Sequence, residues 1–567
     1  MGRFDGGMPD GIQDAPTPGP ADAAGAADAG GAAPPEPYAR RWWALTALSM
    51  SLIIIVVAVS SMNVTLPSLV RELDASSTEL QWIVDAYAMV FGGLLLFFGA
   101  LGDRYGRKGA LQIGLVIFGL ASLVATTTDS PAQLIGIRAT MGVGAALIMP
   151  ATLSIIIAIF PPDERPRAIA VWVGFVGAGT SIGPVVGGYL LEHFWWGSVF
   201  FLNVPLVAIG LVGSALLVPR SRDDEHRGLD PVGGVLSIAC LGGLLFGIIE
   251  GPELGWTDPR VITGFAVGLV VGLAFVVWER RHPQPMLVLD WFREPRFTVS
   301  ALVITLIFFA LFGFLFSMTQ YLQFARDWSP LTAGAAMLPM AFTLAIASPR
   351  GARVAARHGP RTTIIVGVLL AMVALAALSR LTLSTPYLAI AACLVLLGAG
   401  MGLASPSATT GITTSLPLGK AGVGSAINDT TREVGGALGI AVLGSMLQTS
   451  YRASLDPHLA GLPAEAASTA QEGIGSALQV AARLPASAGS GLADAARDAF
   501  VHGMNFTLTG AAIVFGITAL LVRRFHPAIT PSAEGAEAHA PAPSPAAASS
   551  SAVAAPSAAA PLLRPRR

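Results

Sequence analysis

The chain has 567 residues, of which 53% are hydrophobic and only 12% are charged, and its formal net charge is −1. Charged residues make up about a quarter of a typical water-soluble protein, so this composition excludes a soluble globular protein and predicts one that crosses a membrane many times. Nothing in the charge balance indicates a nucleic-acid partner.

Cysteine and histidine usage indicates neither a disulfide framework nor a metal site. Cys240 and Cys393 lie in apolar runs far apart in the sequence, as expected of small buried side chains. The eight histidines are scattered, and neither HExxH nor CxxC occurs. We therefore expect no metal, and without a P-loop we expect no nucleotide or other cofactor.

Two terminal segments have a composition unsuited to folding. Residues 1–41 are rich in Gly, Ala, Pro and Asp, and residues 527–567 are rich in Pro, Ala and Ser. Such segments cannot bury enough apolar surface to form a core. Both are predicted to be disordered tails.

Between the tails, apolar runs recur at about 20 residues, the length that crosses a bilayer as a helix. They predict fourteen spans in an all-α protein. The spans are placed at 43–63, 80–101, 109–127, 133–158, 168–191, 198–218, 231–249, 261–279, 298–322, 331–349, 362–380, 385–406, 422–448 and 503–523.

The distribution of basic residues orients these spans. Arg and Lys crowd the short loops on one side, whereas the short loops on the other side hold only Arg71, Arg260, Arg326 and Arg380. Because basic loops face the cytoplasm, both termini are predicted to be cytoplasmic. The sequence therefore predicts a multi-pass protein of the plasma (inner) membrane, in contact with the lipid bilayer.

The segment 449–502, between the last two spans, is predicted to lie outside the cell. Its Ala-rich stretches 464–483 and 492–501 have the pattern of short amphipathic helices outside the membrane. We expect them to cap the exit.

A weak internal repeat divides the chain. The stretch ARVAARHGPR at 352–361 aligns with GALGDRYGRK at 99–108, so that Arg357 matches Arg104 and Gly359 matches Gly106. Duplicated halves are typical of secondary transporters, whose substrate site lies between the halves near the midplane.

The stretch 99–108 places Asp103, Arg104, Arg107 and Lys108 in a short connection between two spans. Four charges cannot lie in hydrocarbon, so a tight turn at the cytoplasmic face is predicted, with Gly106 supplying a positive φ. Any short basic loop has this pattern, so alone it indicates orientation rather than function.

The fifth predicted span contains GTSIGPVVGG. Gly179, Gly183 and Gly187 share one helix face, with Gly188 beside them, and allow another backbone to approach closely. Ordinary helix packing explains these glycines, whereas Pro184 among them removes a backbone donor and bends the helix. Its presence favours a hinge used in transport.

Two charged residues lie within predicted spans. Arg138 needs a compensating partner or a water-filled cavity unless it reaches the outer surface. Asp85 is the first acid within a span, and burial and a nearby cation such as Arg138 act in opposite directions on its affinity for a proton. Asp85 is therefore a candidate proton carrier, unless it lies hydrated at the outer end of its helix, and Tyr87 adds a polar group beside it.

The thirteenth span opens with the polar stretch NDTTRE. Asp429 shares a helix face with both Arg432 and Glu433, so an internal ion pair is easy to form. A solvated helix start and an inner gate are both compatible with this pattern.

Further polar residues at membrane depth are candidates for a substrate cavity among Phe and Met side chains. With Tyr87 and Asn428, these are Asn63, Asn203, Gln320, Tyr321 and Gln323.

With these motifs in place, the chain resembles the major facilitator superfamily, and within it the fourteen-span drug:proton antiporters. GALGDRYGRK at 99, IRATMGVGAA at 137 and GTSIGPVVGG at 179 look like the family's motifs A, B and C. FLNVP at 201, IIEGPELGW at 248, QYLQ at 320 and NDTTREVGGALG at 428 are also similar to its sequences.

The resemblance implies alternating access by two six-helix halves, at 42–220 and 283–526, with two extra helices inserted at 221–282. It implies that Arg138 assists proton transfer and that the bend at Gly183 and Pro184 favours export. It also implies a cytoplasmic gate, for which the candidates are Gly99, Asp103, Arg104, Gly106, Arg107 and Arg432.

The sequence departs from the family at one position. NVTLP at 63 matches an NVALP-like segment, but Ala58 stands near the place where the first span usually carries an acid. Asp85 therefore becomes the leading proton carrier, with Asp429 and Glu433 as the other candidate acids.

We predict a monomeric, proton-coupled exporter of apolar or cationic small molecules such as drugs, dyes or antibiotics, driven by the proton motive force. The alternative is a narrow exporter of one metabolite or self-made antibiotic. An uptake symporter is disfavoured by the bend at Pro184. An enzyme or sensor would need a catalytic constellation or a folded cytoplasmic domain, and neither is visible, so we expect no enzymatic activity.

Overall fold

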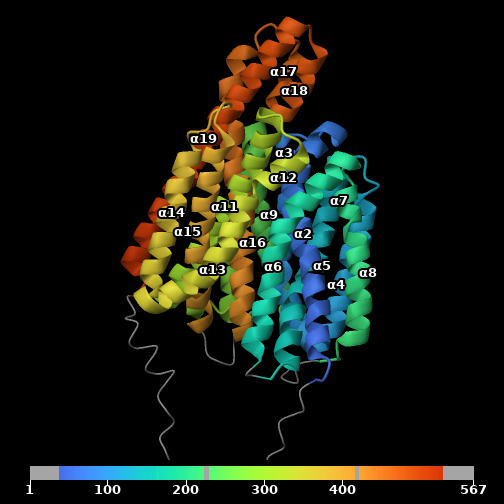
Figure 1. The fold of residues 1–567 in the computed structure, drawn as a ribbon, viewed down its shortest axis with the longest axis vertical. Helices are drawn as coiled ribbons and strands as arrows, with labels where there is room; N and C mark the ends of the chain where they lie inside the picture. Colours follow the sequence, from blue (N-terminus) through green and yellow to red (C-terminus); the bar gives the residue numbers. More distant parts are fainter. Residues whose placement is uncertain (1–37, 162–163, 222–228, 416–420, 528–567) are drawn as a thin grey trace, which may run out of the picture.

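The computed structural model describes residues 38–161, 164–221, 229–415 and 421–527, and the predicted tails lie almost wholly outside them. Within these ranges the regular elements are helices, arranged as an upright bundle with a smaller helical cap (Figure 1). We call the end that carries α17 and α18 the top, and the end where α2 begins at Arg41 the base. By the charge rule the base is the predicted cytoplasmic side.

Long helices occupy all the predicted span positions. They are α2 (Arg41–Leu73), α3 (Ser77–Tyr105), α4 (Arg107–Ala125), α5 (Pro131–Ile159), α6 (Arg165–His193), α7 (Ser198–Phe201) with α8 (Asn203–Leu217), α9 (Pro231–Leu254), α10 (Pro259–Arg281), α11 (Pro295–Gln320), α12 (Pro330–Ala336) with α13 (Leu338–His358), α14 (Pro360–Leu378), α15 (Tyr387–Thr414), α16 (Ala421–Leu455) and α19 (Ala486–Phe525).

Twelve helical segments of the described ranges are long and apolar enough to cross a membrane. The helices α6 and α16, at the fifth and thirteenth predicted spans, are equally long but are not among those twelve. A polytopic helical membrane protein is thus confirmed, and the exact number of fourteen crossings stays a prediction.

Glycine contacts recur in the two halves of the bundle. Gly114 of α4 and Gly144 of α5 each face the other's carbonyl oxygen, and Gly367 of α14 and Gly400 of α15 do the same. Backbones can approach this closely only where no side chain intervenes. The internal repeat expected from the loops is therefore also present in the packing of the helices.

The basic turns at the base are built alike in both halves. Gly106 has φ of 124° and Gly359 has φ of 83°, a region that side-chain-bearing residues rarely adopt. In each turn the glycine N–H caps the preceding helix, on Gly102 O in one half and Ala355 O in the other. The predicted positive φ at Gly106 is confirmed.

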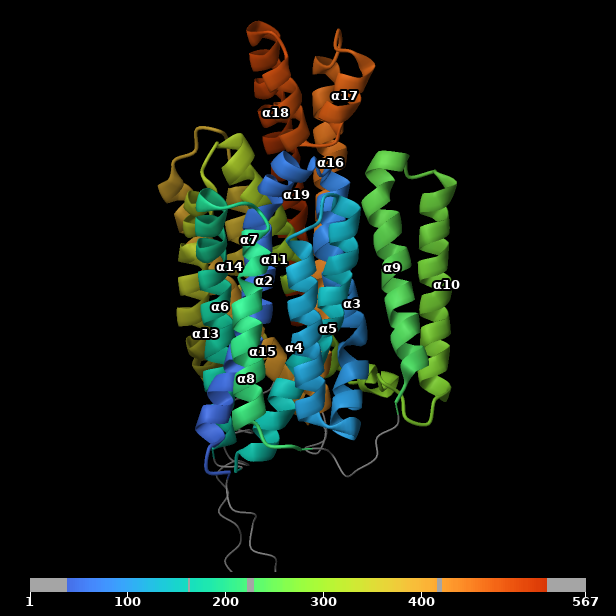
Figure 2. The same cartoon turned by 90° about the vertical axis from the view of Figure 1, so that its right-hand side faces the viewer.

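The inserted helices α9 and α10 form a hairpin beside the main bundle (Figure 2). They pack against each other through the close approach of Gly243 to Gly264 and Gly268. Only α9 lies against the bundle, where it contacts α3 and α16.

The predicted layout of segment 449–502 is partly wrong. Helix α16 continues to Leu455, and the stretch 464–483 divides into α17 (Ala464–Gln471) and α18 (Ile474–Arg483) at Gly473. The stretch 492–501 is not a separate short helix, because α19 runs unbroken from Ala486 to Phe525. Residues 486–523 contain no proline that would end the helix before the last span.

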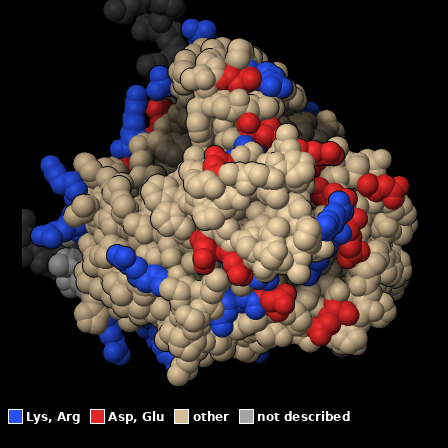
Figure 3. Space-filling view, turned by 90° about the horizontal axis from the view of Figure 1, so that it is seen from above, with Lys and Arg blue, Asp and Glu red and all other residues tan. Residues whose placement is uncertain are grey.

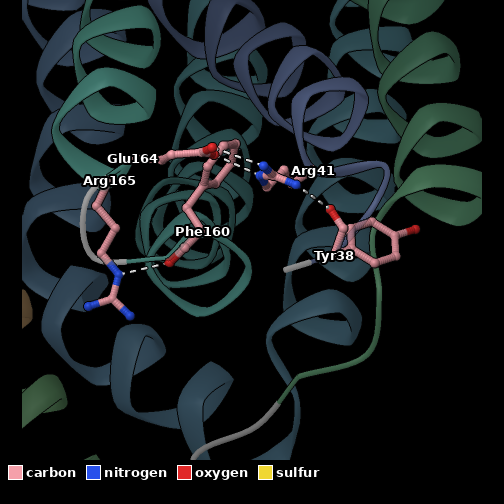
Figure 4. Close-up of polar contacts among 5 residues, drawn as sticks. All are labelled: Tyr38, Arg41, Phe160, Glu164 and Arg165. Atoms are coloured by element: carbon pink, nitrogen blue, oxygen red, sulfur yellow. Dashed lines mark hydrogen bonds and ion pairs between the residues drawn. The ribbon is translucent and has the colours of Figure 1, made fainter. Parts of the chain in front are cut away.

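At the base, the start of α2 is anchored to the connection before α6 (Figure 4). Arg41 donates two hydrogen bonds to Glu164, from Nε at 2.7 Å and from Nη2 at 2.9 Å. These bonds from the guanidinium lower the pKa of the Glu164 carboxyl. Arg165 donates to Phe160 O and closes the same connection.

We predict that Gly144→Val destabilises the protein. The added side chain would meet the Gly114 carbonyl and Phe118, and overpacking of this kind costs about 1–3 kcal/mol. A lower melting temperature in detergent would show the effect. Gly136→Val in the same helix is the matched control, because a Cβ there meets nothing within 4 Å, and equal losses in both variants would contradict the prediction.

Candidate functional site

The two halves meet where α3 crosses α16. A Cβ on Gly92 of α3 would lie 3.0 Å from Glu433 Cβ, and one on Gly444 of α16 would lie 2.8 Å from the Gln81 side chain. The two helices run in opposite directions in a constant register, which places Asp85 of α3 opposite Ile440. The joint between the halves thus extends from Glu433 upward to Gln81.

Asp85 is fully buried on this face of α3. Neither of its carboxylate oxygens has a hydrogen-bond partner among the described residues. The alternative in which Asp85 lies hydrated at the outer end of its helix is therefore wrong. Burying an ionised carboxylate without a partner carries a large free-energy cost.

Arg138 is 1% exposed and does not pair with Asp85. Its Nε donates to Ile83 O at 3.0 Å, and its guanidinium lies 4.4 Å from the centre of the Tyr87 ring. Cation–π contact of this kind stabilises a desolvated cation. The alternative in which Arg138 reaches the outer surface is wrong, because the protein encloses the side chain.

Tyr87 connects residues of both halves. Its ring carries Arg138 of α5, and it lies on α3 five residues before Gly92, where Glu433 of α16 approaches the helix. Its hydroxyl has no hydrogen-bond partner among the described residues. Tyr87 therefore stands between the predicted coupling residues Arg138 and Glu433.

The polar start of α16 is a local cluster. Arg432 Nη1 lies 3.7 Å from Asp429 Oδ1, and its guanidinium lies 4.5 Å from the centre of the Phe308 ring. Asn428 accepts from Thr409 and donates to Asp429. The ion pair is confirmed, and since Asn428 and Asp429 are buried, this segment is not a solvated helix start.

The residues of the predicted gate at the base are only partly brought together. Arg107 Nε binds Asp103 Oδ1 at 2.7 Å, and Gly99 packs on Pro150 of α5. Arg104 lies over the ring of Tyr105. Lys108, which was predicted only to mark the loop, donates to two carbonyls at the end of α8, and Arg432 pairs within its own helix.

The glycines of the fifth span make two different contacts. Gly179 and Gly187 pack on α2 at Val56 and Ser61, and Gly183 packs on Ser60. Gly188 faces Leu331 of α12 in the other half, and Pro184 O faces Gly334. The helix is continuous through Pro184, so the bend there stays a prediction.

The predicted cavity residues make separate contacts, and a shared cavity among them stays a prediction. Gln323 donates to Val64 O at 2.9 Å and joins α2 to a π-helical turn, η3 (Tyr321–Ala325). Tyr321 donates to Thr382 O, Gln320 to Phe316 O, and Asn203 to Ser122. Asn63 is buried in α2 with its Oδ1 unpartnered among the described residues.

Two groups at the top were missed by sequence reasoning. Arg71 donates to Gln323 at 3.4 Å, which adds a cation to the joint between α2 and η3. Helix α18 fits between the halves, with Gly475 against Val70 and Phe324 and with Gln479 donating to Val70 O. The Ala-rich composition of the segment predicted helices there, but it did not indicate which residues of the bundle they contact.

Acidic side chains are spread over the top (Figure 3). Glu472, between α17 and α18, is half-buried, and burial raises its pKa, as do Glu253, Glu79 and Asp74, whereas Arg452 acts in the opposite direction. The Glu472 carbonyl accepts from Ser77 N at 3.1 Å. The backbone of Glu472 thus docks the cap on α3, and the surroundings of its side chain disfavour the ionised carboxylate.

A cavity of about 600 Å³ lies elsewhere, between the upper parts of α9, α16 and α19. It is lined by Ile248, Ser445, His502 and Phe506, among others. None of the seven predicted cavity residues lines it.

Comparison with known proteins identifies relatives that match most of the chain. Residues 48–440 match the family model of the Major Facilitator Superfamily. The multidrug efflux pump LfrA of Mycolicibacterium smegmatis is 37% identical over 85% of this chain and 96% of its own length. The methylenomycin A resistance protein of Streptomyces coelicolor is 34% identical over 72% of this chain and 86% of its own.

A solved structure shares the fold. A bacterial homologue of the human lysosomal transporter Spinster, in an inward-facing and unoccupied conformation, superposes with a TM-score of 0.59 at 17% identity. The superposition covers 87% of this chain and 99% of that one.

We predict that docking of the cap depends on pH. The pKa of Glu472 is higher in the docked cap than its ordinary value of 4.5, so protonation favours docking. The favourable contribution is complete below 4.5 and is lost as pH rises through the raised pKa. Amide exchange in α18 should therefore be faster at neutral pH than at pH 4 once intrinsic rates are corrected.

Glu472→Gln should remove this dependence and slow exchange at neutral pH, because the neutral amide has no charge whose burial opposes docking. Glu465→Gln, an exposed acid on α17, is the matched control. A pH dependence that persists in Glu472→Gln would contradict the assignment.

Proposed function

We propose that this chain, which belongs to the Major Facilitator Superfamily, exports small apolar or cationic compounds by alternating access. The observation that carries the proposal is the joint between α3 and α16, where contacts between the two halves surround a buried acid. The efflux pump among its relatives, aligned over almost its whole length, supports export as the direction.

Joints at the top define the conformation from which transport starts. Gly444 with Gln81, Gly188 with Leu331, and Gln323 with Val64 O hold the halves together there. In the proposed cycle the base opens to the cytoplasm while these contacts are formed, and the top opens after they separate. This proposal places the protein in the plasma membrane with its base inside, as the basic loops predict.

Proton coupling is proposed to use Asp85. A proton removes the cost of burying its charge, so the closed joint favours the protonated form. Opening the top would hydrate the α3 face and change the protonation of this acid. Tyr87 and Arg138 lie beside it, Glu433 meets α3 at Gly92, and these residues would transmit the change between halves.

The energy source is sufficient for an exporter. One charge that moves inward across a membrane potential of about 100 mV supplies roughly 2.3 kcal/mol. Since about 1.4 kcal/mol corresponds to a tenfold ratio, one proton sustains a substrate gradient on the order of fiftyfold. We propose that the protein works as a monomer, without a cofactor or a chemical reaction.

A second candidate is a narrow exporter of a single antibiotic or metabolite. The relative that confers methylenomycin A resistance favours it. A panel of cationic dyes and structurally unrelated antibiotics separates the two, because a narrow exporter would move one class only.

We predict energised dye uptake into everted membrane vesicles that contain the protein. Uptake should collapse with a protonophore, and Asp85→Asn should reduce it to the level of vesicles without the protein, because the amide cannot exchange a proton. Asp129→Asn, an exposed acid in the loop between α4 and α5, is the matched control and should leave uptake unchanged.

Protonophore-sensitive uptake that survives Asp85→Asn would move coupling to Asp429 or Glu433. Absence of energised uptake across the whole panel would contradict export of these compounds.

A further inference from the structure

The upper end of the inserted helix α9 forms hydrogen bonds with both halves of the bundle. Glu250 accepts from Trp82 Nε1 of α3 at 2.8 Å. Ile248 O accepts from Ser445 Oγ of α16 at 2.6 Å, and Pro252 O accepts from Arg452 Nη1 at 2.7 Å. These contacts lie in the IIEGPELGW motif, to which the proposed function gives no role.

The motif provides two backbone acceptors for structural reasons. In an α-helix, the carbonyl of residue 248 would accept from the N–H of residue 252, but Pro252 has no N–H. Ile248 O is therefore free to accept from Ser445. Helix α9 ends at Leu254, so Pro252 O is among the last carbonyls, which have no partner within the helix, and Arg452 supplies one.

The contacts of α9 with the two halves differ in extent. Along α3, glycines and side chains meet from near the base to the top, at Gly234 with Phe97, Gly93 with Ile238, and the Glu250 bond to Trp82. The two hydrogen bonds from α16 are accepted near the upper end of α9, by Ile248 O and Pro252 O. Among the described residues, α9 thus meets the N-terminal half along its length, whereas its hydrogen bonds to the C-terminal half lie near the top.

We propose that the inserted hairpin moves with the N-terminal half and that the upper end of α9 is a latch, which holds the top closed by binding α16. Ser445 and Arg452 are the positioning residues of this latch, and Pro252 frees the carbonyl that Ser445 binds. When α3 and α16 separate at the top, the bonds to Ser445 and Arg452 break, while the packing of α9 on α3 persists. The latch rests on the alternating access of the proposed function.

The test measures the distance across the top by spin labels in the protein reconstituted in lipid. One label is placed at Thr127, after α4, and the other at Ser384, before α15, both exposed. Cys240 and Cys393 are first replaced by Ala so that only the labelled cysteines react. In the labelled protein without substitutions in the latch, most molecules should show the shorter label-to-label distance, which corresponds to a closed top.

Ser445→Ala should raise the ratio of long to short distances about fivefold, the factor expected for one neutral hydrogen bond. Pro252→Ala should also raise it, because the restored N–H occupies Ile248 O within the helix. In the Pro252→Ala background, Ser445→Ala should add little, since its acceptor is already taken.

Ser317→Ala is the matched control, because this buried serine donates only within its own helix, α11. Unchanged distances in both latch variants, additive effects in the double variant, or an equal shift in Ser317→Ala would each overturn the latch. Distances do not depend on substrate, so a latch that responds as expected in a protein without dye uptake would stand while the export proposal failed.

Discussion

A helix within hydrocarbon has to satisfy its backbone hydrogen bonds internally, and this constraint shapes how the two halves of the protein can touch. They can separate and rejoin only across surfaces that exchange few backbone partners. Glycine faces meet this requirement, as at Gly92 against Glu433 and at Gly188 against Leu331. Helix α9 offers two backbone carbonyls to α16, one because Pro252 lacks an N–H and one because it lies at the C-terminal end of the helix.

The same joint explains why a small set of polar residues is enough for transport. Asp85, Tyr87 and Arg138 lie on neighbouring turns of α3 and α5, and Glu433 of the other half meets α3 at Gly92. The acid has no fixed partner among the described residues, whereas the cation is held by an aromatic ring and a carbonyl. Protonation of Asp85 therefore changes the charge buried in the joint, whereas Arg138 stays bound to the same ring and carbonyl.

The order and type of the elements followed from the sequence, because apolar length and basic loops report directly on the membrane. The turn at Gly106 and the ion pair of Asp429 with Arg432 followed as well, since both are local along the chain. Contacts between distant helices did not. Spacing gave no means to tell that Arg138 lies on Tyr87 rather than on Asp85, or that Asn203 serves only to tie α8 to α4.

The segment before the last span shows a second limit. Alternating Ala and polar residues indicate helices but do not fix where one ends, so the unbroken helix α19 was not predicted. The docking of α18 on Val70 and Phe324 depends on residues more than a hundred positions away. The role of IIEGPELGW likewise became visible only when α3 and α16 were placed around it.

The central claim is that Asp85, in the joint between α3 and α16, carries the proton that is exchanged for substrate. Its most direct test is proton release when a cationic dye is added to the purified protein in weakly buffered detergent, followed with a pH indicator. The account predicts that dye binding acidifies the solution with wild type and not with Asp85→Asn. Dye that binds wild type without releasing a proton would contradict it.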